Sequence, residues 1–143
     1  MKVLPTARIL LVDPHQERRE DVRQALVNFG IGAILEATTV ADITHQPPEA
    51  DLLVVHASTA ENIPENPFRD GNGMPAILIA PLPAAPLERM QIQMGYEGAL
   101  AAPTAPRMLY RRIGCVLQQA RRASRAVRPD NPDATESTAA PIP

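Results

Sequence analysis

The residues that could do chemistry are few and lie far apart in the sequence. Asp13 and His56 each follow a run of four aliphatic residues. A carboxylate and an imidazole could serve as general base, metal ligands, phosphoryl acceptor or pH switch. However, Asp13 has no paired acid or nucleophile in a recognisable motif, and His15 and His45 have no spacing to His56 that indicates a metal site. We therefore interpret Asp13 as a turn residue at a strand end or a helix cap, and His56 as a partly buried histidine that fills a vacated pocket.

Other motifs for catalysis or cofactor binding are missing. The single cysteine, Cys115, excludes an internal disulfide and a cysteine-based zinc site. It lies two positions beyond Ile113 in a segment with core-facing helical spacing, which favours structural burial over reactivity. The glycines at 30 and 32 precede an expected strand and therefore indicate a turn rather than a dinucleotide loop. The sequence DPHQER after the first aliphatic run is unlike a flavin phosphate loop. We expect no catalytic residue, no cofactor and no metal, and so no enzyme.

Composition restricts the chain to one domain that acts without aromatic platforms. The 143 residues are 45% hydrophobic, enough for a single core, but they include only two Phe, two Tyr and no Trp. Base-stacking surfaces and aromatic cages are therefore poorly supported, and the formal charge of -2 argues against a protein that coats nucleic acid. The first aliphatic run is bracketed by Arg8 and Asp13, unlike a signal peptide, and the uncharged stretch 71–87 holds four prolines. These features predict a cytoplasmic protein with no membrane segment.

Short aliphatic runs alternate with segments of helical spacing along the chain. Runs without polar alternation suit strands that are covered on both faces, as in a parallel sheet. The expected strands are 9–12, 32–35, 52–55, 76–79 and 99–102. Apolar residues recur at helical spacing within 22–29, 87–94 and 109–120, a short helix is expected around 39–44, and prolines and glycines break any helix within 57–73. The alternation predicts an α/β fold, a three-layer doubly wound parallel sheet.

The periodic pattern stops after about residue 122. The last residues are rich in Pro, Ala, Ser, Thr and acids and offer almost nothing to bury. We therefore predict one folded domain over 1–122 and a disordered tail over 123–143.

The strand ends carry a family resemblance. In a parallel sheet, functional groups gather beyond the carboxyl ends of the strands. The succession ILLVD-P, ADLLVVH, MPAILIAP and GYEGALAAP, within about residues 8–122, resembles the CheY-like receiver domain of two-component response regulators. The resemblance implies a flavodoxin-like (βα)5 sheet with the strand order 2-1-3-4-5.

The resemblance also implies a phosphorylation site that this chain has lost in most positions. In that family the first strand ends in two adjacent acids that hold Mg²⁺, the third in the phospho-accepting Asp, the fourth in Thr or Ser, and the fifth in Lys followed by Pro. In that order, this chain has Asp13, Pro14, His56, Ala80, Ala102 and Pro103. Mg²⁺ prefers carboxylate oxygens, and a transferring phosphoryl group needs compensating positive charge. The resemblance thus implies a degenerate pocket, and hence a pseudo-receiver.

The last predicted helix is strongly basic. Residues 107–128 hold seven arginines and no acid, whereas the preceding 106 residues have a formal charge of -6. At about 100° per residue, one side of this helix carries Leu109, Ile113, Val116, Leu117 and Ala120. The opposite side carries an arginine stripe of Arg107, Arg111, Arg122 and Arg125. This stripe is either a solvated charged surface or a docking surface for an acidic partner, for a second copy of the chain, or for RNA.

The receiver resemblance also implies where partners bind. In that family the face made by helix four, strand five and helix five is the usual surface for dimers and output. On this face we place Met90, Met94, Arg107, Tyr110, Arg111 and Arg112.

Together these features predict a protein-interaction module for bacterial two-component signalling or gene regulation that works independently of phosphorylation. Its expected partner is another signalling or regulatory protein, with a homodimer through the same face as a further possibility. The degenerate pocket and the arginine-rich helix are similar to the amidase-operon antiterminators, but this sequence lacks their coiled coil and RNA-binding domain. Two alternatives stay open: an atypical response regulator phosphorylated at His56 or Asp13, and binding of RNA or DNA through the arginine stripe.

Overall fold

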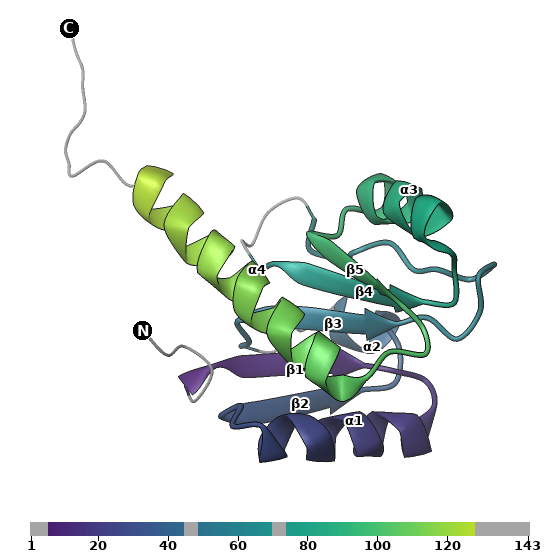
Figure 1. The fold of residues 1–143 in the computed structure, drawn as a ribbon, viewed down its shortest axis with the longest axis horizontal. Coiled ribbons are helices and arrows are strands. Elements are labelled where there is room, and N and C mark those ends of the chain that lie inside the picture. Colours follow the sequence, from purple (N-terminus) through teal and green to yellow (C-terminus); the bar gives the residue numbers. More distant parts are fainter. Residues whose placement is uncertain (1–5, 45–48, 70–73, 128–143) are drawn as a thin grey trace, which may run out of the picture.

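The aliphatic runs of the chain pair in parallel into one sheet. In the computed structural model, which describes residues 6–44, 49–69 and 74–127, the strand order is β2-β1-β3-β4-β5 (Figure 1). The strands are β1 (Arg8–Val12), β2 (Ala33–Ala37), β3 (Leu52–His56), β4 (Ala76–Ala80) and β5 (Gly98–Ala101). The predicted α/β class and strand order are confirmed. The second strand extends two residues further than expected, and the fifth ends at Ala101, so Ala102 follows the strand.

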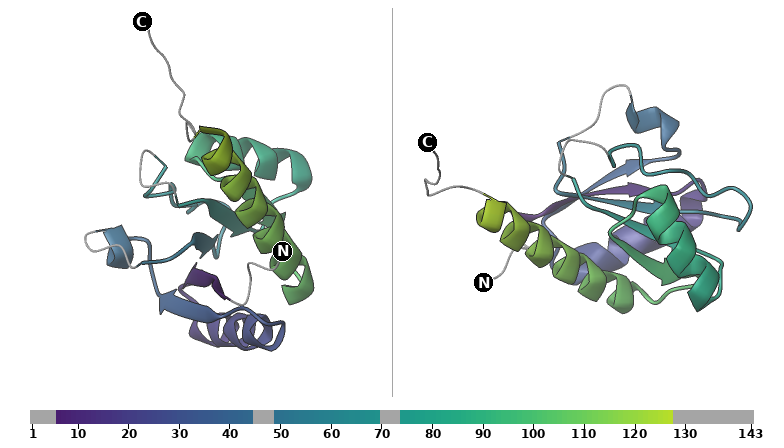
Figure 2. Two further views of the ribbon diagram at one scale, coloured as in Figure 1. Left: turned by 90° about the vertical axis from the view of Figure 1, so that its left-hand side faces the viewer. Right: turned by 90° about the horizontal axis from the view of Figure 1, so that it is seen from above.

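Helices cover both faces of this sheet. They are α1 (Gln16–Asn28), α2 (Ala41–Thr44), α3 (Ala84–Met94) and α4 (Pro106–Val127). α1 and α4 pack on one face of the sheet, and α2 lies on the opposite side from α4 (Figure 2). The predicted boundary at residue 122 falls inside α4, and the predicted tail beyond residue 127 lies outside the described residues. Within the described ranges, no helix is long and apolar enough to cross a membrane.

The core is split by the sheet into two apolar layers. Alternate strand residues point to opposite faces, so Leu11 and Val54 pack with α1 and α4, whereas Leu10 and Val55 pack with α2 and α3. All five residues of β3 and of β4 are buried. This double coverage explains why the strands read as uninterrupted aliphatic runs rather than as alternating patterns.

The crossover from β3 to β4 replaces a helix with an irregular segment. Its described part, residues 57–69, contains no helix, as the prolines and glycines predicted. The side chain of Asn66 is buried, and its Nδ2 donates to the carbonyl oxygen of Gly95 at 2.8 Å, just beyond α3. The hydroxyl of Tyr96 donates to the carbonyl oxygen of Pro64 at 2.7 Å. These bonds hold the segment against the end of α3 and leave the carboxyl ends of β1 and β3 without a long helix above them on this face.

Candidate functional site

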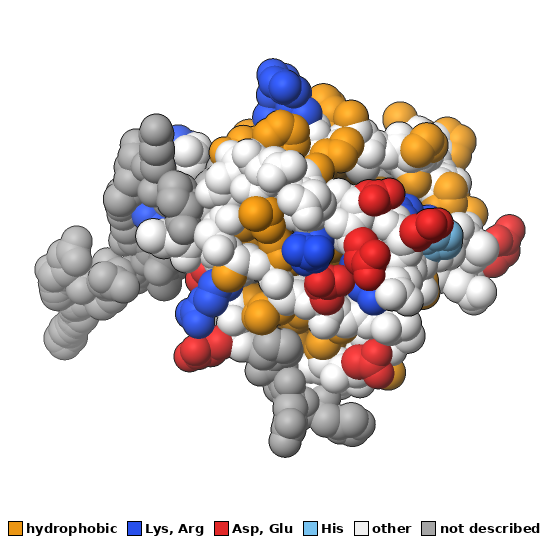
Figure 3. Space-filling model, turned by 90° about the horizontal axis from the view of Figure 1, so that it is seen from below, with side chains coloured by type: hydrophobic (Ala, Val, Ile, Leu, Met, Phe, Trp, Pro, Cys, Tyr) orange, Lys and Arg blue, Asp and Glu red, His pale blue; other side chains and the backbone are white. Residues whose placement is uncertain are grey.

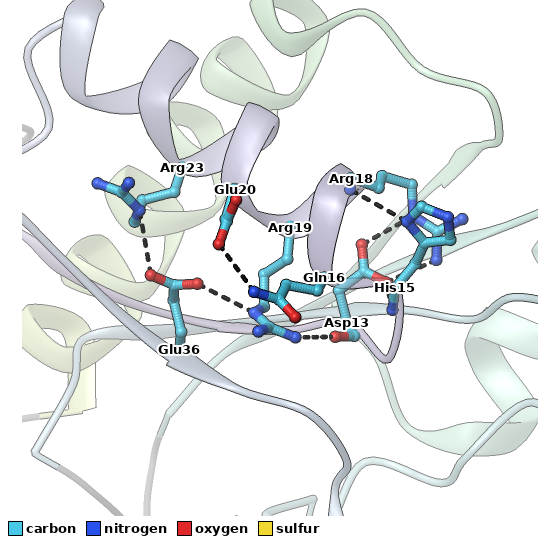
Figure 4. A network of polar contacts seen from close by, with 8 residues as sticks. All are labelled: Asp13, His15, Gln16, Arg18, Arg19, Glu20, Arg23 and Glu36. Carbon is cyan, nitrogen blue, oxygen red and sulfur yellow. Dashed lines mark hydrogen bonds and ion pairs between the residues drawn. The ribbon is translucent and has the colours of Figure 1, made fainter.

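The carboxylate of Asp13 is buried at the end of β1 and is held by Arg18 (Figure 4). The guanidinium binds both oxygens: Nε donates to Oδ2 at 2.8 Å and Nη2 donates to Oδ1 at 2.6 Å. The backbone N–H of His15 donates to Oδ1 at 2.9 Å. The side chain of Asp13 is 1% exposed, whereas that of Arg18 is 32% exposed. The charge of the carboxylate is therefore neutralised by a two-bond ion pair, the strongest form of this interaction.

The start of α1 explains how Arg18 reaches this position. His15 is the N-cap of the helix, and its Nδ1 accepts a hydrogen bond from the backbone N–H of Arg18 at 3.1 Å. Of the two roles expected for Asp13, the structure shows the turn residue at the strand end and not the helix cap, because its oxygens bind the backbone N–H of the cap residue and the guanidinium. A cation in the first turn of a helix is unfavourable with respect to the helix dipole. The buried carboxylate of Asp13 supplies the compensating charge.

A second arginine ties the same turn to the sheet. Nη1 of Arg19 donates to the carbonyl oxygen of Asp13 at 2.7 Å, and its Nε binds Glu36 of β2 at 3.0 Å. Arg23 binds the other oxygen of Glu36 at 3.1 Å. Seen from the side of α1, acidic and basic side chains lie interspersed on the surface (Figure 3). The network fixes α1 to the ends of β1 and β2.

His56 is buried at the end of β3, in the strand next to β1. It is 7% exposed, and its Nδ1 is buried without a hydrogen-bond partner among the described residues. Burial lowers the pKa of His56 below its ordinary value of 6.5, and the positive charge of Arg18 lowers it further, while Asp13 opposes the shift. His56 is therefore a neutral imidazole at pH 7. His56 also lines an open cavity, and the expectation that it fills a vacated pocket stays a prediction.

The other predicted pocket residues gather at the same edge of the sheet. Ala80 is the last residue of β4 and is fully buried, and the backbone N–H of Ala102 donates to its carbonyl oxygen at 2.8 Å. Pro14 and Pro103 are both exposed. Thus the structure brings the predicted set to one edge, but only Asp13 and His56 carry ionisable groups there.

A cavity of about 610 Å³ lies beside His56, and no pattern in the sequence predicted it. It is lined by the ends of β1 and β3, by residues 38–40 and by the irregular segment 57–64. The polar residues among its lining are Thr38, Thr39, Ser58, Thr59, Glu61 and Asn62, besides His56. The signal available in the sequence was a pair of hydroxyl residues after each of two strands.

Comparison with known proteins identifies the architecture. No protein-family model and no curated protein matches the chain. Solved structures do match, among them a CheY-like response regulator receiver domain from Methanospirillum hungatei JF-1, with a TM-score of 0.66, 17% identity, and coverage of 82% of this chain and 98% of that one. The chain has the receiver fold. A response regulator from Desulfuromonas acetoxidans aligns with a TM-score of 0.61, 24% identity and coverage of 79% and 98%, and an orphan response regulator of H. pylori with 0.64, 16%, and 80% and 99%.

The α4 residues of the predicted interaction face lie on different sides of the helix. The guanidinium of Arg107 lies 5.6 Å from the ring centre of Phe29, at the end of α1, and the ring of Tyr110 lies 5.2 Å from the same ring. Arg112 instead bonds weakly to the carbonyl oxygen of Ala99 in β5, through Nη1 at 3.4 Å. The two sides of α4 therefore carry different members of the predicted set.

The remaining members of that set differ in exposure. Met90 and Met94 are half-buried and pack against the core layer under α3. Arg111 is exposed, as is Arg122 of the arginine stripe. Cys115 is exposed on α4, so the expectation that it is buried is wrong. His45 and the side chain of Arg125 lie outside the described residues.

We predict that removing Arg18 destabilises the fold. The substitution Arg18→Met leaves a buried carboxylate unpaired and is expected to lower the free energy of unfolding by about 3 kcal/mol in urea denaturation. Adding Asp13→Asn should recover part of this loss, because no buried charge is then left. Arg23→Met removes a partner of the more exposed Glu36 and should cost about 0.5 kcal/mol or less. Equal losses for the two arginine variants would contradict this interpretation.

We also predict that His56 makes stability depend on pH. The unfolded chain takes up a proton on His56 near pH 6.5, whereas the lowered pKa of the folded state opposes that uptake. The free energy of unfolding should therefore fall as the pH drops below about 6.5, and His56→Gln should show a shallower fall. Denaturation at several pH values, with an NMR titration of the His56 ring, measures both quantities. A ring pKa above 6.5 would show that the interpretation is wrong.

Proposed function

We propose that this chain is a pseudo-receiver: it acts in signalling or regulation by binding another protein, without phosphorylation at its strand ends. The ion pair between Asp13 and Arg18 is the observation that carries the proposal. It supplies, from within the chain, the positive charge that a metal ion provides in a phosphorylated receiver.

The side chains at this edge do not fit a magnesium site. Mg²⁺ is a hard cation that binds oxygen ligands, above all carboxylates, in a near-octahedral arrangement. Asp13 carries the only carboxylate among the six predicted pocket residues, and both of its oxygens accept hydrogen bonds from Arg18. In the described ranges, no group of three His, Cys, Asp or Glu residues is placed to hold a metal ion. A metal ion at Asp13 would therefore have to displace the guanidinium.

The neighbouring positions offer no substitute for phosphoryl chemistry. A transferring phosphoryl group accumulates negative charge that needs cations or hydrogen-bond donors. The side chains of Ala80 and Ala102 supply neither, and the guanidinium of Arg18 is already engaged by Asp13. These three facts support a domain that keeps the receiver fold but is not switched by phosphorylation.

The basic side of α4 supports an acidic protein as the partner. Arg107, Arg111 and Arg122 are exposed on it, and α4 contains no acidic residue. Met108 is also exposed, which adds an apolar contact beside the charges. A regulatory protein with an acidic surface would fit this mode of action, and a second copy of the chain is the competing occupant.

We predict that acetyl phosphate does not modify the protein. After incubation with acetyl phosphate and Mg²⁺, intact-mass measurement at neutral pH should give the mass of the untreated chain, because neither the metal ion nor the phosphoryl group has a site. A receiver with the complete acidic set, treated in parallel, should gain a phosphoryl group.

A stable phospho-adduct of the wild-type chain that disappears in His56→Ala or in Asp13→Asn would contradict this proposal. It would support the alternative, an atypical response regulator that is phosphorylated at one of these residues.

A further inference from the structure

We propose that the cavity beside His56 binds an uncharged small organic molecule that has an apolar body and a hydroxyl or amide group. The geometry of the cavity supports the binding site by itself. The further idea that the bound molecule is the signal, in place of phosphorylation, rests on the proposed function.

The cavity has the size and the position of a ligand site. Its volume of about 610 Å³ lies within the usual range for small-molecule pockets. It opens at the carboxyl ends of β1 and β3, where the chain leaves the sheet toward opposite faces and where parallel sheets commonly bind ligands. The space exists because α2 has a single turn and the described part of the following crossover, residues 57–69, has no helix.

His56 provides the second observation that points to a ligand. His56 lines the cavity and is more than nine-tenths buried, yet its Nδ1 has no hydrogen-bond partner within the part of the chain that the structure describes. A buried polar atom left without a partner is unfavourable, because it has lost its bonds to water without replacing them. Because Nδ1 is itself buried, a rotation of the ring toward the cavity would let a hydroxyl or amide group of a bound molecule supply the missing bond, and a hydroxyl suits either tautomer because it both donates and accepts.

The charges around the cavity exclude strongly ionic ligands. No Lys or Arg is among the residues that line it, so an anion has no counter-charge there. The nearby guanidinium of Arg18 is committed to Asp13, and His56 is neutral because its pKa is lowered by burial. Glu61 is the single acid in the lining and is exposed to water, which gives a cation little to bind.

The remaining lining suits a neutral molecule with both apolar and polar parts. Val12 and Val55 at the strand ends, with Val40 and Ile63 opposite, provide apolar walls. The hydroxyl-bearing residues and the amide of Asn62 border them and offer hydrogen bonds of both directions. This combination of apolar walls and a few polar groups is typical of sites that bind uncharged organic molecules.

Three ring compounds that differ in charge test the proposal. Amide signals of the ¹⁵N-labelled full chain are recorded while benzamide, benzoate or benzylammonium is added. Benzamide should shift the signals of Val40, Ser58 and Asn62 saturably, with the charged probes binding at least about tenfold more weakly. His56→Leu should weaken benzamide binding by about tenfold, because the hydrogen-bonding ring is lost.

A blocking variant keeps the test independent of the histidine. Asn62→Trp places a large side chain in the cavity wall and should abolish the shifts, whereas Asn28→Trp, on the exposed end of α1, should leave them unchanged. The proposal is overturned if no probe gives saturable shifts, if benzoate binds best, or if Asn62→Trp binds benzamide like the wild type. The acetyl phosphate experiment does not involve this cavity, so either result can fail without the other.

Discussion

The ion pair between Arg18 and Asp13 is the interaction on which the functional end of this fold depends. A carboxylate buried at the end of a strand must be paired, because an isolated charge is too unfavourable in the protein interior. Here the partner comes from the first turn of α1, which ties that helix to β1 through both oxygens. The same bonds remove the ligands that a metal ion would need. One interaction thus ties α1 to the sheet and, under the proposed function, takes the place of the metal ion of a phosphorylated receiver.

The same end of the sheet also carries the cavity beside His56. With no helix between residues 57 and 69, the end of β3 is covered by a loop held at Asn66 and Tyr96. The loop leaves His56 buried, and among the described residues nothing bonds to its Nδ1. The cavity lies at the same edge of the sheet, and its described lining combines apolar and polar residues with one acid, Glu61, and no Lys or Arg.

The sequence predicted the sheet well because its physical cause is local. β3 and β4 are buried on both faces, so each had to be an aliphatic run. The pairing of Asp13 was not predictable, because it depends on the turn at Pro14 and His15 that brings Arg18 back over the strand end. The cavity depends on the path of a loop that has no periodic pattern. The exposure of Cys115 was predictable: two positions beyond the buried Ile113 is roughly 200° around a helix, on its other side.

Paramagnetic broadening by Mn²⁺ tests the central claim most directly, because Mn²⁺ seeks the same oxygen ligands as Mg²⁺. The amide signals of Asp13, His56 and Ala57 are compared with those of the exposed acidic residues of α1 during the titration. If Arg18 holds the carboxylate, the signals at the strand ends broaden no more than those of the surface acids. Selective broadening of the strand-end signals at low Mn²⁺ concentration would show that the metal displaces the guanidinium, and would contradict this account.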